Sequence, residues 1–115
     1  MRILVCGSRH FNDYEAVARE LQRIGDIGLI IHGAAQGADT CGERYAMANS
    51  IPMQSFPADW ERYGKSAGPI RNRQMLKEGA PDLVVAFRGP NSRGTQDMIN
   101  AATKAGIPVE IINVQ

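Results

Sequence analysis

Residues 82–98 read Asp-Leu-Val-Val-Ala-Phe-Arg-Gly-Pro-Asn-Ser-Arg-Gly-Thr-Gln-Asp-Met, and this stretch decides the fold. Residues 83–87 are an unbroken apolar run, which is typical of a parallel strand buried on both faces. Two glycines and a proline follow, and from Thr95 onward apolar side chains recur at helical spacing. The stretch therefore predicts a strand, a glycine loop and a helix. At such a junction the free N–H groups of the helix favour an anion such as phosphate, although similar turns also occur where nothing binds.

The glycine loop does not indicate an ATPase. Gly89 and Gly94 have the spacing of the two glycines of a P-loop, but Thr95 stands where that motif has lysine. Gly94 is nevertheless expected to adopt unusual backbone angles and to allow close approach of a phosphate.

Length and composition predict one domain, residues 1–115, located in the cytoplasm. The sequence has no apolar run near the ~20 residues that span a bilayer, and no signal-peptide pattern follows Met1. Cys6 and Cys41 lack metal-type spacing and are interpreted as buried free thiols. Neither a metal site nor a cofactor is expected. A net charge of +1 gives no general attraction to nucleic acid.

The remaining elements follow from apolar runs and turn residues. Strands are expected at residues 2–6, 29–32, 53–56, 83–87 and 109–112. Helices are expected from an Asn12 cap to Gly25, after the Gly33–Asp39 loop to about Asn49, from Pro69 to Gly79, and from a Thr95 cap onward. Residues 57–68 are expected to form a long loop without secondary structure.

This order of elements predicts a Rossmann-like three-layer α/β/α fold with a five-stranded parallel sheet of strand order 3-2-1-4-5. Strands one and four are then neighbours where the winding reverses, and ligands bind at the carboxyl ends of strands there. The glycine turns after strands one, two and four should converge on that edge.

Five of the ten arginines fall in segments predicted to lie at the carboxyl edge. They are Arg9, Arg71, Arg73, Arg88 and Arg93. An anionic small molecule is the simplest explanation for this clustering. Alternatively, some of them point into water or pair with Asp39, Asp59, Glu61 or Asp97.

Other candidate residues keep two interpretations. Asp39 is interpreted first as a helix N-cap and second as a ligand residue. His32 is equally a site residue or a hydrogen-bonded core histidine. Trp60 and Tyr63 either pack as a plug in the loop or offer a ring to a nucleobase or ribose.

Five motifs then show a family resemblance that covers nearly the whole chain. They are Cys6-Gly7-Ser8-Arg9 with Phe11 and Asp13, His32-Gly33-Ala34-Ala35-Gln36-Gly37-Ala38-Asp39, Phe56-Pro57-Ala58-Asp59-Trp60, Gly68-Pro69-Ile70-Arg71-Asn72 and Gly94-Thr95. They closely resemble the YspA, cpYpsA-related branch of the SLOG superfamily, whose members are Rossmann-like and include the LONELY GUY phosphoribohydrolases and the DNA-processing protein A group. The resemblance implies a nucleotide or nucleotide-derived ligand and a homodimer. The expected ligand-binding residues are Gly7, Ser8, Arg9, His32, Gly33, Gly37, Asp39, Trp60, Arg71, Asn72, Gly89, Arg93, Gly94 and Thr95.

The chain departs from the phosphoribohydrolase motif at the glutamate that supports N-glycosidic cleavage. Met98 occupies that position, and Asp97 is one residue early. We therefore expect a binding protein, a sensor or a sequestering protein, without phosphoribohydrolase turnover. One alternative is a nucleotide-processing hydrolase that uses Asp97, Asp39 or Asp59. A weaker alternative is single-stranded nucleic-acid binding through Arg71, Arg73 and Trp60, because Arg71-Asn72-Arg73 resembles the DNA-processing group.

Overall fold

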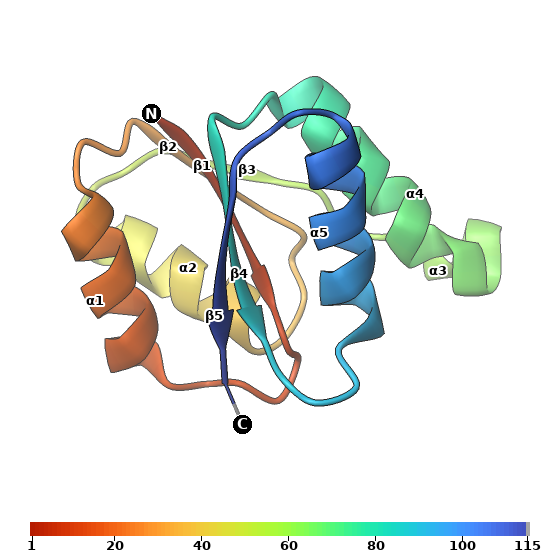
Figure 1. The fold of residues 1–115 in the computed structure, drawn as a ribbon, viewed down its shortest axis with the longest axis horizontal. Helices are drawn as coiled ribbons and strands as arrows, with labels where there is room; N and C mark the ends of the chain where they lie inside the picture. The colour runs from red at the N-terminus through yellow and green to blue at the C-terminus, as the bar shows by residue number, and fades with distance from the viewer. Residues whose placement is uncertain (115) are drawn as a thin grey trace.

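The computed structural model describes residues 1–114, which form one five-stranded parallel sheet of order β3-β2-β1-β4-β5 (Figure 1). The strands are β1 (Arg2–Gly7), β2 (Leu29–His32), β3 (Met53–Ser55), β4 (Leu83–Arg88) and β5 (Val109–Asn113). The α-helices are α1 (Tyr14–Ile24), α2 (Ala38–Ala48), α3 (Trp60–Tyr63), α4 (Ala67–Gln74) and α5 (Arg93–Lys104). A 3₁₀ turn, Gly64–Ser66, precedes α4, and a π-helical turn, Met75–Gly79, follows it. The fold class and the strand order predicted from the sequence are confirmed.

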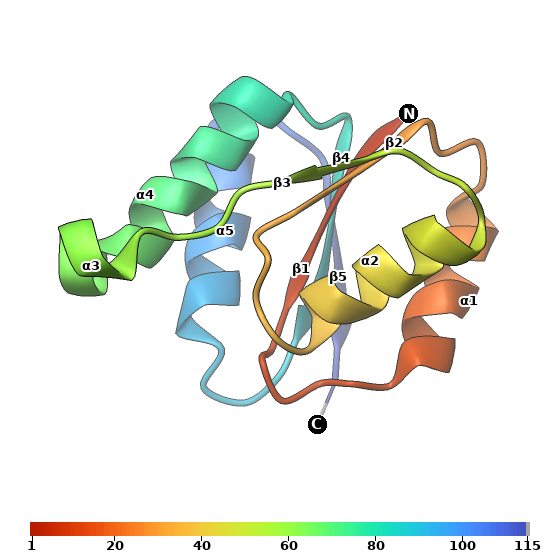
Figure 2. The same cartoon turned by 180° about the vertical axis from the view of Figure 1, so that it is seen from behind.

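Helices cover both faces of the sheet. Figures 1 and 2 show α1 and α2 on one face and α4 and α5 on the other, with α3 at the outer end of α4. The central strand β1 pairs with β2 on one side and β4 on the other, with Leu4 opposite both Ile31 and Val84. Strands β1 and β4 are therefore neighbours, as right-handed crossover connections predict.

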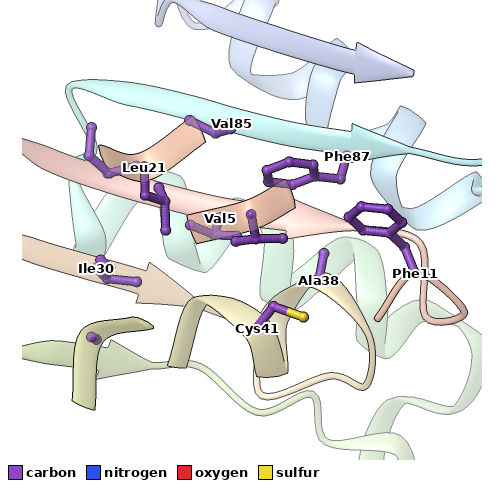
Figure 3. Close-up of a cluster of buried hydrophobic side chains, with 11 residues drawn as sticks. Val5, Phe11, Leu21, Ile30, Ala38, Cys41, Val85 and Phe87 are labelled. Atoms are coloured by element: carbon purple, nitrogen blue, oxygen red, sulfur yellow. The ribbon is translucent and has the colours of Figure 1, made fainter. Parts of the chain in front are cut away.

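Successive residues of β1 face the two opposite layers, so that the strand contributes to two hydrophobic cores. Ile3 and Val5 pack under α1 and α2, and Leu4 packs with Met98 under α4 and α5. Figure 3 shows the first of these cores, in which the rings of Phe11 and Phe87 stack with centroids 5.5 Å apart. Burial on both faces explains why the strand sequences show apolar runs without alternation.

Three predictions about the helices are wrong. The cap of α1 is Asp13 and not Asn12, because the Asp13 carboxylate accepts a hydrogen bond from the N–H of Ala16 (3.2 Å). Residues 57–68 are not a structureless loop, since Asp59 caps α3 by accepting from the N–H of Arg62 (3.1 Å). Helix α4 also begins two residues before Pro69, whose missing N–H falls in the first turn, where it removes no helical bond.

Cys6 and Cys41 are both buried free thiols, as predicted, and burial raises the pKa of each. Residues 1–114 contain no helix that is long and apolar enough to cross a membrane. Within the same residues no three His, Cys, Asp or Glu side chains come together as a metal site would require. The cytoplasmic location stays a prediction.

Candidate functional site

The turns after β1, β2 and β4 pack directly on one another at the carboxyl edge of the sheet. Gly37, with φ of +81°, lies against the backbone of Ser8 and Arg9, where a Cβ would collide with both residues. A Cβ on Gly89 would lie 3.0 Å from the Cβ of Ser8. The predicted convergence of the glycine turns is therefore confirmed. Gly37 is required for this packing, whereas a Cβ at Gly89 would make a tight contact that a small shift of Ser8 would relieve.

Gly7 and Ser8 also have structural roles in this packing. A Cβ on Gly7 would lie 2.6 Å from the carbonyl oxygen of Phe87 and 2.7 Å from the Cβ of Ala38. Ser8 is buried, donates its N–H to that same Phe87 oxygen (2.9 Å), and accepts at Oγ from the N–H of His10 (3.2 Å). The turn after β1 is therefore stabilised by hydrogen bonds and packing within the protein, without a ligand.

A cleft of about 440 Å³ opens beside these turns, toward β2 and β3. It is lined by Arg9, Gly33, Ala34, Ala35, Gln36, Pro57, Ala58, Trp60 and Arg71. Its only charged side chains are the two arginines, so the electrostatic potential of the lining favours an anion.

Arg71 is fixed in the wall of this cleft. Its Nη1 donates to the carbonyl oxygen of Gly33 (2.6 Å) and its Nε donates to Oδ1 of Asn72 (3.2 Å). The guanidinium lies over Gly33 so closely that a Cβ there would be 2.8 Å from Cζ of Arg71. The side chain is thus ordered before any ligand arrives, while its other N–H groups stay available to an acceptor in the cleft.

Two buried side chains accept hydrogen bonds from the backbone of the loop after β2 and hold it in place. Asp39 accepts from the N–H of Gly33 at Oδ2 (2.7 Å), and Nδ1 of His32 accepts from the N–H of Ala34 (3.0 Å). Burial raises the pKa of Asp39, and the Gly33 hydrogen bond and the charge of Arg71 oppose this shift. The helix N-cap of α2 is Gly37, so the N-cap interpretation of Asp39 is wrong because its carboxylate turns back to the loop.

Trp60 is 56% exposed although it lines the cleft, and Tyr63 is 39% exposed. The guanidinium of Arg62 lies 5.1 Å from the centre of the Tyr63 ring. Neither residue packs as a buried plug, and of the two only Trp60 lines the cleft.

Asn72, Arg73 and Asp97 tie α4 to α5 and lie outside the cleft lining. The buried Asn72 amide donates to the carbonyl oxygen of Gly94 (3.1 Å) and to Oδ2 of Asp97 (3.0 Å). Arg73 forms a two-bond ion pair with Asp97 (2.8 and 3.1 Å). The Arg73 hydrogen bonds lower the pKa of Asp97, and the Asn72 hydrogen bond adds to this effect. Arg73 therefore has the carboxylate partner that the sequence left as an alternative to a ligand.

The start of α5 differs from the prediction. The N-cap is Ser92 and not Thr95, which is buried in the first turn of the helix. Ser92 Oγ accepts from the N–H of Gly89 (3.0 Å). Gly94 is helical, without a positive φ, and a Cβ there would have no neighbour within 4 Å, so the expectation of unusual backbone angles is wrong. Arg93 is exposed and does not line the cleft.

Arg88 and Met98, two further residues considered in the sequence analysis, also lie outside the cleft. Arg88 donates from Nε to Asn113 (3.0 Å) and from Nη1 to Gln96 (3.0 Å), which turns it away from the cleft. Met98, at the position of the phosphoribohydrolase glutamate, is fully buried in the core beneath α4 and α5.

Five residues that line the cleft were not among the predicted ligand residues. All five residues belong to two of the motifs quoted above, residues 32–39 and 56–60. Nothing in the sequence indicated which residues of these motifs would line a cleft. Ala34, for example, has φ of +56°, which a non-glycine residue rarely adopts. These five residues are Ala34, Ala35, Gln36, Pro57 and Ala58.

Together, the sheet order and the cleft at the carboxyl edge define a Rossmann-like α/β fold with an arginine-lined candidate ligand site. The sequence pattern of the YspA, cpYpsA-related SLOG family matches residues 1–63. The Gene 61 protein of Mycobacterium phage D29 is 38% identical over 117 residues, which cover 94% of this chain and 93% of the phage protein. The chain belongs to the YspA, cpYpsA-related SLOG family.

Two solved structures share the fold at 20% sequence identity. DNA processing protein A (DprA) from Streptococcus pneumoniae superposes with a TM-score of 0.79 over 99% of this chain, which spans 50% of that protein. Phosphoribosylglycinamide formyltransferase from Bacillus halodurans gives a TM-score of 0.50 over 100% of this chain and 56% of its own. At this identity the two structures support the fold and carry no argument about a ligand.

Proposed function

We propose that this protein binds a phosphate-bearing nucleotide or nucleotide-derived small molecule in the cleft, as a sensor or a sequestering protein. The observation that carries the proposal is an ordered guanidinium, Arg71, in the same cleft as the exposed ring of Trp60. A phosphate needs charged donors, and a base needs an apolar face, so one cleft supplies both requirements.

The dimensions and charge of the cleft suit such a ligand. Its volume of about 440 Å³ falls within the range of roughly 300 to 1,000 Å³ usual for small-molecule sites. Arg9 is exposed and free to move toward a phosphate, whereas Arg71 is held in place, which reduces the entropy lost on binding. The absence of an acidic side chain from the lining removes the main source of repulsion toward phosphate.

The positions of the carboxylates favour binding over hydrolysis. A general acid or base must lie within hydrogen-bond reach of the reacting group. Asp39 accepts from Gly33 beneath the loop, Asp59 caps α3, and Asp97 pairs with Arg73. None of the three lines the cleft.

Nucleic-acid binding has weaker support. The formal net charge of the chain is only +1, and Arg73, one of the three residues expected to contact a strand, is paired with Asp97. Salt-dependent binding of an oligonucleotide, without binding of small nucleotides, would favour this alternative over the proposal.

The direct experiment is native mass spectrometry of the full chain purified from cells, with identification of any retained small molecule. AMP, GMP, CMP, UMP and inorganic phosphate are then titrated, with tryptophan fluorescence as the readout, because Trp60 is the only tryptophan. We expect a nucleotide to quench Trp60 and to bind more tightly than phosphate alone. Arg71→Ala should weaken nucleotide binding roughly 10-fold to 150-fold, the effect of ~1.5 to 3 kcal/mol for a charged hydrogen bond.

Arg19→Ala is the matched control, because Arg19 is an exposed arginine on α1, on the opposite face of the sheet. The proposal is wrong if no small molecule is retained and none of the nucleotides binds. It is also wrong if Arg71→Ala and Arg19→Ala bind like the parent.

We also propose that the protein is a homodimer that pairs through the helices beside the cleft. Trp60 and Tyr63 on α3 are 56% and 39% exposed, and Ile70 on α4 is 41% exposed. Helices α3 and α4 contact each other, and exposed large apolar side chains on neighbouring helices are typical of a protein interface. Light scattering at tens of micromolar should give twice the chain mass of 12.5 kDa, and a monomer would contradict this proposal.

A further inference from the structure

A second cavity lies between α4 and α5, the two helices that cover the face of the sheet opposite α1 and α2. It has a volume of about 390 Å³ and is lined by residues of α4 and its π-helical turn on one side and of α5 and the segment after it on the other. Figure 1 shows the two helices α4 and α5 on this face of the sheet. We call it the helix groove, and its lining residues are Arg73, Leu76, Lys77, Ala101, Lys104, Ala105 and Ile107. It shares no lining residue with the cleft.

The helix groove combines apolar and cationic side chains. Leu76, Ala101 and Ile107 are half-buried and supply apolar surface. Lys77 and Lys104 are exposed, and within residues 1–114 neither has a carboxylate within 4 Å. The chain has only three lysines, so two of the three meet at this one groove.

The electrostatic effect of a helix end can explain why the two lysines lie where they do, but it does not explain the apolar surface between them. Lys104 lies in the last turn of α5 and Lys77 in the π-helical turn after α4, where the partial negative charge of a helix end favours a cation. That effect requires no apolar surface between the two lysines. Arg73 adds no free charge, because Asp97 neutralises it.

We propose that the helix groove binds a small amphipathic anion, a carboxylate or phosphate group attached to a short alkyl chain or an aromatic ring. The apolar part would lie on Leu76, Ala101 and Ile107, and the anionic group would bind Lys77 and Lys104. No acidic side chain lines the groove, so its charge is complementary to such a ligand. A second copy of the chain is a poorer occupant, because a two-fold contact would bring the same lysines together without a carboxylate.

Decanoate is the probe for this site, and decyltrimethylammonium, with an alkyl chain of the same length and the opposite charge, is its control. Both are titrated below their micelle concentrations into the isotope-labelled full chain, and backbone amide shifts are followed by NMR. We expect decanoate to shift the amides of Leu76, Ala101 and Ile107, and decyltrimethylammonium to bind at least about 10-fold more weakly. No binding of decanoate, or shifts confined to residues outside the groove, would overturn the proposal.

Charge reversal gives the second test. The double variant Lys77→Glu, Lys104→Glu should lose decanoate binding at least about 10-fold, whereas Lys65→Glu, at the third lysine, should bind like the parent. Ala101→Phe fills the groove without changing its charge and should also abolish binding. Equal binding by the parent and both groove variants would overturn the proposal. It would also be overturned if the double variant changed a dimer into a monomer while decanoate failed to bind the parent, because a second copy would then fill the groove.

Discussion

Replacement of Gly33 by alanine tests whether the glycine exists to admit the Arg71 guanidinium. Gly33 does not have a positive φ, so alanine meets no backbone penalty there. Its Cβ would instead lie 2.8 Å from Cζ of Arg71 and 3.1 Å from Cδ, which is inside normal contact distance. Because the obstacle is the far end of a flexible side chain, the fold should survive while Arg71 moves away.

The size of the effect follows from the contact that is lost. Arg71 Nη1 donates to the Gly33 carbonyl oxygen at 2.6 Å in a half-buried position. A charged hydrogen bond contributes ~1.5 to 3 kcal/mol, and partial exposure places this one near the lower end, about 1.5 kcal/mol. With a urea m-value of ~1 to 3 kcal/mol/M, the unfolding midpoint of Gly33→Ala should fall by roughly 0.5 to 1.5 M.

A double-mutant cycle with Arg71→Ala isolates this contact. Urea unfolding is measured for the parent, both single variants and the double variant. Once the guanidinium is absent, Gly33→Ala should be neutral or stabilising by ~0.4 to 1 kcal/mol, because alanine restricts the unfolded chain. An equal loss of stability from Gly33→Ala in both backgrounds would refute the assignment of this glycine to Arg71.

Three further predictions concern α5. Gly94→Ala should stabilise the protein by ~0.5 to 1 kcal/mol, because Gly94 is helical and its Cβ position is open; a fall in the urea midpoint would contradict this. Asp97→Asn should lower the free energy of unfolding at neutral pH, and the difference from the parent should vanish in acid. The sign follows because the lowered pKa of Asp97 stabilises the folded state above the ordinary value of 3.8, and this contribution is lost as the pH falls through the folded pKa; parallel pH profiles would argue against it. Finally, chromatography of reactions with nucleoside monophosphates should detect no free base above a buffer control, since Met98 replaces the expected glutamate; release that disappears in Asp97→Asn would promote the hydrolase alternative.

The architecture could be predicted because it depends on patterns that are local in the sequence. Residues 83–87 are apolar without alternation, and β4 is indeed buried on both faces. Short right-handed crossovers then leave few possible strand orders, and the expected one is observed. The same reasoning placed Arg9 and Arg71 at the carboxyl edge, where they line the cleft together with Trp60.

Side-chain pairing could not be predicted, because it depends on which helix faces meet. Nothing in the spacing of Arg73 and Asp97, 24 residues apart, indicates that α4 and α5 bring them within 2.8 Å. Arg88 likewise pairs with Asn113 at 3.0 Å only because β4 and β5 are neighbours. Clustering of arginines in the sequence therefore overestimated the number available to a ligand.

The glycines explain why the open space lies away from the β1–β4 junction. A Cβ on Gly7 would collide with Phe87 and Ala38, and a Cβ on Gly37 would collide with the backbone of the turn after β1. A Cβ on Gly89 would press against Ser8, so protein atoms already fill the junction itself. Space opens further along the edge, between the turn after β2 and the segment that leads into α3 and α4. Under the proposed function, a phosphate entering this space would meet Arg71 and the loop after β2, whereas the start of α5 does not line the cleft. Arg71→Ala should therefore weaken nucleotide binding far more than Arg93→Ala, and calorimetry that found the opposite order would place the ligand at the glycine loop of residues 88–94 instead.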